Sequence, residues 1–278
     1  MPAINDMNNN ISGSIVLYKS PEDILIKVIN STLNSQLIKQ LFLLDNSPTN
    51  SLKNISDDPR VIYIHNPSNP GFGAAHNIAI KKAIEDGSSY HFVINPDVYF
   101  EKDVITPMID YMKTNPNIGM IMPEVLNTDG SVQNLPKLLP NPLSIVLRKL
   151  KKPTSFYQKF INKYELRFVK RNKIYNAPIL SGCFTLLNLN AIKEIGGYDD
   201  SYFMYFEDWD LSRRMTEMYE TIYFPKVSIY HDYNSGANKS FYLFKIYLKS
   251  AFHYFNKWGW FFDKKRKEIN AKTLTQFK

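Results

Sequence analysis

The segment His91–Phe100 (HFVINPDVYF) contains the first residues whose types and spacing could perform chemistry. Its apolar part, FVI, is typical of a short buried strand, and Asn95, Pro96 and Asp97 follow directly. Proline has no N–H group to donate to a sheet, so we expect the strand to end here. Asp97 would then lie at the carboxyl end of a strand, where open α/β sheets bind their ligands. The alternative is an ordinary turn that caps a helix beginning at Asp103.

A second group of candidate residues lies near the end of the chain. Glu207 and Asp208 follow an aromatic run and open a predicted helix, where an acidic first turn is the structural alternative. Exclusion of water by aromatic rings would raise the pKa of a carboxylate, as a general base requires. The rings are those of Tyr202, Phe203, Tyr205, Phe206 and Trp209. A lone histidine such as His231 is usually structural, but a histidine and a carboxylate make a workable pair of metal ligands.

Alternating strand and helix patterns predict the elements that position these residues. The expected strands are 14–18, 40–44, 61–65 and the one that ends at Asn95, with helices at 24–33 and 74–85. This alternation predicts an α/β fold with a parallel, Rossmann-like sheet. In the second half we expect strands at 118–125, 178–187 and 221–230, and helical segments at 141–173, 190–195 and 207–218.

Polar loops follow four of the predicted strands and would meet at one edge of the sheet. They are Tyr18-Lys19, Asp45-Asn46, Gly71–Asn77 and Asn95–Asp97. Asp45 is suited to accept a hydrogen bond from the imide N–H of a uracil or thymine base. Gly71 and Gly73 would let backbone N–H groups approach an anion at a helix N-terminus, although a Gly-x-Gly pair is more often a turn.

Composition limits the class of protein. The 278 residues carry a net charge of +8, which suits anionic lipid or phosphorylated substrates, and basic residues cluster at 148–152, 163–173 and 264–267. No nucleic-acid-binding motif is present, so nucleic acid is not an expected partner. The single cysteine, Cys183, excludes an intrachain disulfide framework and a cysteine-rich zinc site. We find neither a signal peptide nor a membrane-spanning run, which predicts a cytoplasmic location.

Seven motifs in chain order resemble those of family-2 glycosyltransferases with a GT-A fold, and most closely those of bacterial O-antigen rhamnosyltransferases. They are LYKSPED, LLDNSP, NPGFGAAHNIAI, VINPDVYF, LSGCFTLL, GGYDDSYFMYFEDWDLSRR and IYHDYNSGANKS. The resemblance covers residues 13–240, with a flexible N-terminus at 1–12 and a C-terminal extension at 241–278. Two departures are Asn95-Pro96-Asp97 in place of a motif with two aspartates, and Tyr18-Lys19 where the family often has Tyr-Asn.

The resemblance implies a role for each motif. Asp208 would be the catalytic base, with Glu207 beside it, in a single inverting displacement. Asp97 and His231 would hold Mg²⁺ or Mn²⁺, and Gly182 and Trp209 would contact the acceptor. The residues expected to bind the nucleotide-sugar donor are Tyr18, Asp45, Asn46, Gly71, Phe72, Gly73, Asn77, Asn95, Asp97 and Lys239. Lys239 lies in a basic loop that would close on the diphosphate.

The implied reaction transfers L-rhamnose from dTDP-rhamnose to a lipid-linked O-antigen or surface-polysaccharide intermediate. One alternative keeps the enzyme and changes the donor to a UDP-hexose or a UDP-N-acetylhexosamine. A nucleotidyltransferase is an alternative of another class, but it should carry a glycine-rich loop after the first strand, and residues 17–22 contain no glycine. The third alternative is a non-catalytic, membrane-bound protein that binds glycans.

The C-terminal segment Phe241–Phe262 is aromatic and apolar nearly all round if it is helical. The run Lys264–Lys267 (KKRK) follows it, and we expect this run to be solvated. Aromatic and basic residues in this order are typical of a helix that lies on an anionic membrane surface. This favours a peripheral protein on the inner face of the cytoplasmic membrane. The alternative is a helix buried against the catalytic domain or against a second subunit, as in a homodimer.

Overall fold

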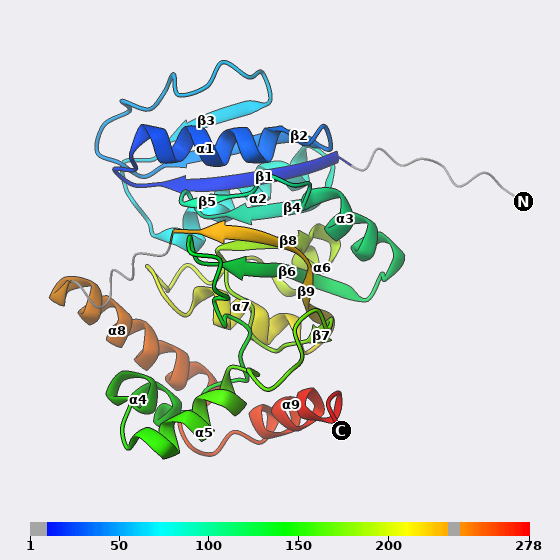
Figure 1. The fold of residues 1–278 in the computed structure, drawn as a ribbon. Helices are drawn as coiled ribbons and strands as arrows, with labels where there is room; N and C mark the ends of the chain where they lie inside the picture. The colour runs from blue at the N-terminus through cyan, green and yellow to red at the C-terminus, as the bar shows by residue number, and fades with distance from the viewer. Residues whose placement is uncertain (1–9, 233–239) are drawn as a thin grey trace, which may run out of the picture.

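Nine strands within the described residues form one mixed sheet in the order β3-β2-β1-β4-β8-β6-β9-β5, with β7 paired to β9 (Figure 1). The computed structural model describes residues 10–232 and 240–278. The first four strands are parallel, as predicted: β1 (Asn10–Leu17), β2 (Ile38–Asp45), β3 (Val61–His65) and β4 (Ser88–Ile94). β1 begins earlier than expected because Ile11 already pairs with Ile38 of β2.

The second half of the sheet contains the antiparallel pairings. β8 (Phe184–Asn188) runs antiparallel to both β4 and β6 (Ile118–Leu126). β9 (Glu220–His231) is parallel to β6 and antiparallel to the short strands β5 (Val98–Tyr99) and β7 (Tyr175–Asn176). The prediction of a strand over 178–187 is wrong for residues 178–183. Leu180 donates to Ser212 and Gly182 donates to Asp208, both side chains of the helix that begins at Glu207, and these bonds interrupt a regular ladder.

Helices cover both faces of the sheet, as the alternating pattern predicts (Figure 1). On one face, α1 (Glu22–Leu33) and α3 (Ile105–Thr114) bury their apolar sides in a core with β1, β4 and β6. On the other, α2 (Phe72–Glu85), α6 (Leu189–Ile195) and α7 (Glu207–Met215) share a second core. Spacings of three and four residues between the buried positions of each helix produce these apolar stripes. These two cores fix the positions of the strand ends, where the candidate site residues lie.

Four further helices gather at the end of the molecule opposite β3: α4 (Pro142–Leu150), α5 (Thr154–Tyr164), α8 (Phe241–Trp258) and α9 (Lys264–Thr275) (Figure 1). The helical segment predicted over 141–173 is therefore two helices followed by turns. Lys151 ends α4 in the left-handed region, at φ 53°, and Pro153 disfavours a helical residue before it. The hairpin made by α4 and α5 packs beside α8, where Ile145 shares a small apolar cluster with Ala251 and Tyr254 (Figure 1).

The C-terminal segment is half buried and half exposed. One side of α8, which includes Ala251, Tyr254 and Phe255, packs on Tyr202 and Phe206. The aromatic and apolar side chains that remain exposed on this segment are Phe241, Tyr242, Leu248, Phe252, Phe261 and Phe262. The segment thus joins the main domain through one face and leaves the other open.

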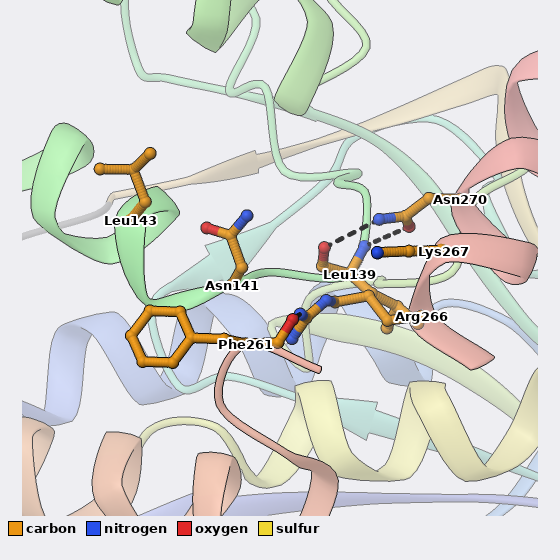
Figure 2. A pocket seen from close by; sticks show the side chains of 7 residues that line it. All are labelled: Leu139, Asn141, Leu143, Phe261, Arg266, Lys267 and Asn270. Carbon is orange, nitrogen blue, oxygen red and sulfur yellow. Dashed lines mark hydrogen bonds between the residues drawn. The ribbon is translucent and has the colours of Figure 1, made fainter. Parts of the chain in front are cut away.

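The expectation that the basic run 264–267 is solvated is wrong for Arg266. Its side chain is buried, and its guanidinium donates hydrogen bonds to the carbonyl oxygens of Pro140, Gly259, Trp260 and Phe261. A planar guanidinium with five N–H groups can satisfy several buried carbonyls at once. Figure 2 shows this arginine beside Asn270, which exchanges two hydrogen bonds with the backbone of Leu139. Arg266 therefore anchors the C-terminus, whereas the three lysines of the run are exposed.

Candidate active site

Glu207 and Asp208 begin α7 directly after a constrained turn. Tyr205 and Phe206 both adopt left-handed backbone conformations, with φ of 70° and 69°. Residues other than glycine seldom do so, and such conformations concentrate at functional sites. The turn places the two carboxyl groups at the first helical positions of α7, beside the irregular segment that contains Gly182.

The two neighbouring carboxyl groups have different surroundings. Asp208 accepts hydrogen bonds from the N–H groups of Trp209 (2.9 Å) and Gly182 (3.2 Å), which partly offset the rise in its pKa caused by burial. Glu207 is 6% exposed, and its Oε2 atom accepts no hydrogen bond from the described residues. Burial, with the adjacent Asp208 charge, raises the pKa of Glu207 to about 8. Burial thus favours the protonated form of both carboxyl groups, and the two N–H donors favour ionisation at Asp208 rather than at Glu207.

A cavity of about 490 Å³ opens in front of this pair. Its lining includes Tyr205, Phe206 and Trp209 from the aromatic run, and His231 from the end of β9. Tyr202 instead packs against His253 of α8, and Phe203, which does not line this cavity, accepts a hydrogen bond from Phe72 through its carbonyl group. The structure thus brings Trp209, expected to contact the acceptor, to the same cavity as Asp208. Gly182 instead positions Asp208 through its N–H group.

Asp97 and His231 meet because Val98 pairs with His231 in the β5–β9 ladder. The Oδ1 atom of Asp97 lies 3.3 Å from the Nε2 atom of His231. This oxygen is buried and accepts no hydrogen bond within the described part of the chain. Asn95 completes the group, with its amide nitrogen 3.3 Å from the same Nε2 atom. A buried carboxylate oxygen facing an imidazole nitrogen fits the requirements of a divalent cation.

Gln133 orients the imidazole and was missed by sequence reasoning. Its amide NH₂ donates to the carbonyl oxygen of His231 (2.8 Å), so its Oε1 atom accepts from Nδ1–H of the same residue (3.2 Å). With Nδ1 as the donor to Gln133, Nε2 carries the lone pair of the ring, next to both Asp97 and the Asn95 amide, as a metal-binding histidine requires. No pattern could reveal this contact, because Gln133 lies in an irregular segment 98 residues before His231.

The two side chains could supply part of a metal coordination sphere. No cluster of three or more His, Cys, Asp or Glu suited to a metal occurs in residues 10–232 and 240–278. Mg²⁺ is commonly held by one or two carboxylates together with substrate phosphates and water. Asp97 and His231 therefore fit a metal that a diphosphate helps to bind.

The ends of β1, β2 and β3 form the region expected to contact the nucleotide base. Tyr18 is exposed there, whereas Asp45 and Asn46 are buried. The Asp45 carboxylate accepts hydrogen bonds from Tyr63 (2.6 Å) and from the N–H group of Ser47 (2.9 Å). Asp45 therefore holds Tyr63 and the turn that follows β2. Its contact with a nucleotide base stays a prediction.

Gly71 and Gly73 have a packing role in the structure, and their approach to an anion stays a prediction. Both glycines are buried against the segment 198–203. A Cβ atom on Gly71 would lie 2.2 Å from the Phe203 carbonyl oxygen, and one on Gly73 would lie 2.8 Å from Cβ of Tyr198. These glycines permit close packing of α2 on the loop that leads to Asp208.

Asn77, predicted to bind the donor, is likewise occupied by that loop. Its amide group donates to the Tyr198 carbonyl and to Asp200, and accepts from the Tyr198 N–H. Phe72 lies closer to the reacting groups, because its ring is 3.5 Å from where a Cβ of Gly182 would stand. Lys239 lies outside the described residues.

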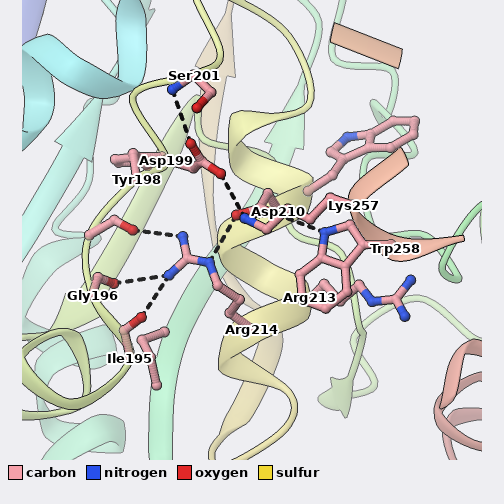
Figure 3. Close-up of polar contacts among 12 residues, drawn as sticks. Ile195, Gly196, Tyr198, Asp199, Ser201, Asp210, Arg213, Arg214, Lys257 and Trp258 are labelled. Carbon is pink, nitrogen blue, oxygen red and sulfur yellow. Dashed lines mark hydrogen bonds and ion pairs between the residues drawn. The ribbon is translucent and has the colours of Figure 1, made fainter. Parts of the chain in front are cut away.

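The far side of α7 is tied to the C-terminal helix (Figure 3). Asp210 accepts hydrogen bonds from Trp258 and Arg214 and pairs with Lys257. Arg213 pairs with Asp263 at 2.8 Å, and its guanidinium stacks on the Trp258 ring. The helix that begins with the catalytic candidates is therefore held by buried ion pairs to residues 257–263.

The fold is that of GT-A glycosyltransferases. Two solved structures show the same fold. GalNAc-T7 with UDP, GalNAc and Mn²⁺ aligns with a TM-score of 0.62 and 14% identity, over 82% of this chain and 44% of that chain. TarS of S. aureus aligns with a TM-score of 0.57 and 12% identity, over 96% of this chain and 43% of that chain. Residues 14–196 match the model of Glycosyl transferase family 2. The chain belongs to this family, which confirms the resemblance of its motifs and removes the nucleotidyltransferase alternative.

Several curated relatives are similar over much of the chain. The N-acetylglucosaminyl-diphospho-decaprenol L-rhamnosyltransferase of Mycobacterium tuberculosis is 27% identical over 191 residues, which are 62% of this chain and 59% of the relative. Rhamnosyltransferase WbbL of Escherichia coli K12 is 25% identical over 255 residues, 86% of this chain and 90% of the relative. The low-salt glycan biosynthesis hexosyltransferase Agl10 of Haloferax volcanii is 24% identical over 209 residues, which are 75% of this chain and 62% of the relative. The chain thus spans about three fifths of the mycobacterial relative.

Proposed function

We propose that this chain is an inverting, metal-dependent glycosyltransferase that transfers L-rhamnose from dTDP-rhamnose to a lipid-linked O-antigen or surface-polysaccharide intermediate. The observation that carries the proposal is the cavity that Asp208 and His231 share, together with the 3.3 Å approach of His231 to Asp97. A candidate base and a candidate diphosphate-binding group therefore lie at the same cavity. The names of the mycobacterial and E. coli relatives favour rhamnose as the transferred sugar.

The proposed reaction is a single displacement. Asp208 removes a proton from an acceptor hydroxyl group, whose oxygen attacks the anomeric carbon of the donor from the side opposite the nucleoside diphosphate. Glu207 stays neutral and adds no charge that would repel the leaving group. Asp97 and His231 would hold Mg²⁺ or Mn²⁺, and such a cation would supply positive charge to the diphosphate leaving group. Trp209, Tyr205 and Phe206 exclude water from the base and so limit hydrolysis of the donor.

A panel of nucleotide-sugars tests the proposal. Purified protein is incubated with dTDP-rhamnose, UDP-glucose, UDP-galactose and UDP-N-acetylglucosamine, and release of the nucleoside diphosphate is measured with and without Mn²⁺. We expect release from dTDP-rhamnose above all. Preference for a UDP-sugar would show that the chain is a glycosyltransferase of the same family that uses a different donor. Absence of turnover with every donor and acceptor would favour the non-catalytic, glycan-binding alternative.

We further infer a peripheral position on the inner face of the cytoplasmic membrane. Among the described residues, no helix has the combination of length and hydropathy needed to cross a bilayer. The support comes from exposed apolar side chains: Leu143, Val146 and Leu150 form a stripe along α4, and Phe261 and Phe262 project from the turn before α9. Figure 2 shows Leu143 and Phe261 beside one cavity, which Lys267 also lines. Apolar side chains bordered by lysines suit the surface of an anionic bilayer.

A further inference from the structure

Lys137 is a buried cation to which the proposed displacement assigns no role. Its side chain lines the cavity in front of Asp208, and the residue is only 5% exposed. The ammonium group donates one hydrogen bond, to the carbonyl oxygen of Leu135, and pairs with no carboxyl group among residues 10–232 and 240–278. A buried ammonium group with so few partners is destabilising, and groups of this kind concentrate at functional sites.

The backbone of Lys137 is fixed to the segment that holds the candidate base. Its N–H and carbonyl groups exchange hydrogen bonds with Ile179, both at 3.2 Å, in an isolated antiparallel bridge. A little further along that segment, Gly182 donates to the Asp208 carboxylate at 3.2 Å. Between these two points, the hydroxyl group of Ser212 on α7 bonds the same segment at an N–H and a carbonyl group. One short segment therefore fixes the position of Lys137 relative to Asp208.

The charges of Lys137 and Asp208 influence each other without a direct ion pair. Burial raises the pKa of Asp208, whereas the N–H group of Gly182 and then the charge of Lys137 lower it. Burial, followed by the charge of Arg148, lowers the pKa of Lys137 to about 8, and the charges of Glu165 and Asp208 limit this fall. Near neutral pH the lysine is therefore mostly protonated, and its positive charge favours the ionised form of Asp208.

Other ionisable groups surround Asp208 without supplying a buried positive charge next to it. Burial favours the uncharged forms of its immediate neighbours, which are Glu207, Cys183 and Tyr198. The opposite wall of the cavity carries cations and one carboxylate, namely Arg148, Lys149, Lys151, Glu165 and Arg167. The remaining titratable lining residues are Tyr157, Tyr205, Tyr247 and His231.

The cations of the opposite wall act on Asp208 less strongly than Lys137 does. Arg148 and Arg167 both pair with the Glu165 carboxylate, which offsets much of their charge. Lys149 and Lys151 are exposed, so water and salt screen them. Lys137 combines burial with a fixed backbone position beside the segment that bonds the base.

We propose that Lys137 is a positioning residue for the transfer reaction, whose buried ammonium group keeps Asp208 ionised and able to accept the proton of the acceptor hydroxyl group. This inference rests on the proposed function, because it takes Asp208 as the base. The proton passes from the hydroxyl group to the Asp208 carboxylate while the new C–O bond forms and the nucleoside diphosphate leaves. Lys137 keeps its own proton throughout. Without this charge, burial would keep Asp208 protonated over more of the neutral range, and a protonated carboxyl group cannot act as a base.

The pKa of Asp208 is measurable without turnover. Protein isotopically labelled at its aspartate carboxyl carbons is titrated by NMR in EDTA, in the Glu207→Gln background so that the paired carboxyl group does not titrate with Asp208. Asp208→Asn identifies the signal. We expect Lys137→Met to raise the midpoint of Asp208 by about one pH unit, a tenfold gain in proton affinity, and Lys137→Arg to stay close to the parent protein.

The matched control is Lys151→Gln, which removes a cation from an exposed position on the same cavity and should leave the midpoint of Asp208 unchanged. An unchanged midpoint in folded Lys137→Met would overturn the proposal. So would an equal shift in Lys151→Gln, because the effect would then belong to the net charge of the cavity. Thermal unfolding of each variant verifies that it is folded.

A reverse measurement decides the question if Lys137→Met does not fold. Coupling between two ionisable groups is reciprocal, so Asp208→Asn should lower the midpoint of Lys137 by a similar amount from its wild-type value of about 8. Isotopically labelled lysine side chains report this midpoint, and Lys137→Arg identifies the signal. If Asp208→Asn leaves the midpoint of Lys137 where it was, the two groups do not interact and the proposal fails.

The pH dependence of transfer separates positioning from a structural role and from donor binding. With saturating dTDP-rhamnose and octyl N-acetylglucosaminide as the acceptor, we expect Lys137→Met to lower kcat/KM for the acceptor about tenfold at neutral pH. The difference should shrink above about pH 8, where the wild-type lysine itself loses its proton. Loss by the same factor at every pH would indicate a structural role and overturn the proposal.

Two further outcomes separate the inference from its alternatives. A tenfold weaker affinity for dTDP in Lys137→Met, with an unchanged midpoint of Asp208, would make Lys137 a donor ligand and overturn the proposal. The expected shifts of both midpoints in a protein that transfers no sugar would refute the proposed function and leave the coupling of the two residues standing. Transfer without the shifts would do the reverse.

Discussion

The indole N–H of Trp258 donates a hydrogen bond to Oδ1 of Asp210 at 2.7 Å, two residues beyond the proposed base. Asp210 is fully buried and also binds Arg214 and Lys257. The C-terminal helix therefore contributes directly to the electrostatic surroundings of α7. Removing one donor from a buried carboxylate leaves a lone pair unsatisfied, which is costly in a region without water.

We expect Trp258→Phe, which keeps an aromatic ring beside Arg213 but removes the donor, to lower the free energy of unfolding by about 1–3 kcal/mol. Urea unfolding followed by fluorescence measures this change. Trp260→Phe is the matched control, because its indole N–H donates to Asn256 in an exposed position. If the two substitutions lower the free energy of unfolding equally, the buried bond to Asp210 contributes no more to stability than the exposed bond to Asn256.

The neighbouring carboxyl groups should respond differently to neutral substitution. Asp208→Asn cannot accept a proton, so we expect a loss in kcat of about 10²–10⁴-fold. Glu207→Gln resembles the uncharged form that burial already favours, and its kcat should stay within about tenfold of the wild type. Both rates are measured at saturating dTDP-rhamnose. A large loss in Glu207→Gln with little loss in Asp208→Asn would exchange the two roles.

The raised pKa of Glu207 also predicts a dependence of stability on pH. Because the folded state keeps its proton up to about pH 8 while the unfolded state releases it near pH 4.5, this group lowers stability as pH rises through that range. Glu207→Gln removes the penalty. We expect the variant to exceed the wild type by a few kcal/mol at pH 7.5 and to match it near pH 4. A constant difference between the two proteins across this range would contradict the assigned burial effect.

Metal binding should depend on Asp97 and on the residue that orients His231. We expect Asp97→Ala to abolish turnover and to remove the effect of Mn²⁺ on dTDP affinity, measured by calorimetry. EDTA should inactivate the native protein, and Mg²⁺ or Mn²⁺ should restore it. Gln133→Met removes the hydrogen bond to Nδ1 of His231 and should weaken metal affinity about 10–100-fold. Full activity in EDTA would refute the metal requirement.

Membrane association should depend on the two phenylalanines before α9. Phe261 and Phe262 are 68% and 98% exposed, so Phe261→Ser combined with Phe262→Ser should leave the unfolding temperature nearly unchanged. We expect this variant to remain in the supernatant when wild-type protein sediments with phosphatidylglycerol liposomes. The control is Met218→Ser, which changes an exposed apolar residue outside the C-terminal segment. If wild-type protein ignores liposomes and forms dimers that the double variant loses, the apolar surface is a subunit interface.

The basic run requires a more selective test than replacement of all four residues. Arg266 is buried and bonded to backbone carbonyls, so its loss would destabilise the fold. Glutamine at Lys264, Lys265 and Lys267 leaves this anchor intact and should weaken liposome binding most at low salt, where electrostatic attraction is least screened. Salt-independent binding of this triple variant, equal to that of the wild type, would exclude a role for the lysines.

The sequence by itself determined the α/β class, the positions of the first four strands along the chain and the helices between them. Those elements are specified by local properties: apolar runs of strand length, helical spacing of apolar residues, and Gly or Pro after each strand. Asp97, Asp208 and His231 could also be chosen in advance. Each directly follows a strand or opens a helix, and such positions meet wherever parallel strands end together.

The tertiary structure decided what the other candidates do. Gly71 and Asn77 were expected at the donor, but contacts with residues 198–203, more than a hundred positions away, occupy them. Gln133 and Arg266 carried no signal in the sequence, because an irregular segment or a basic run has no periodicity that reports burial. Their roles come from long-range packing, in which a polar side chain is buried only where another segment happens to offer it a hydrogen-bond partner.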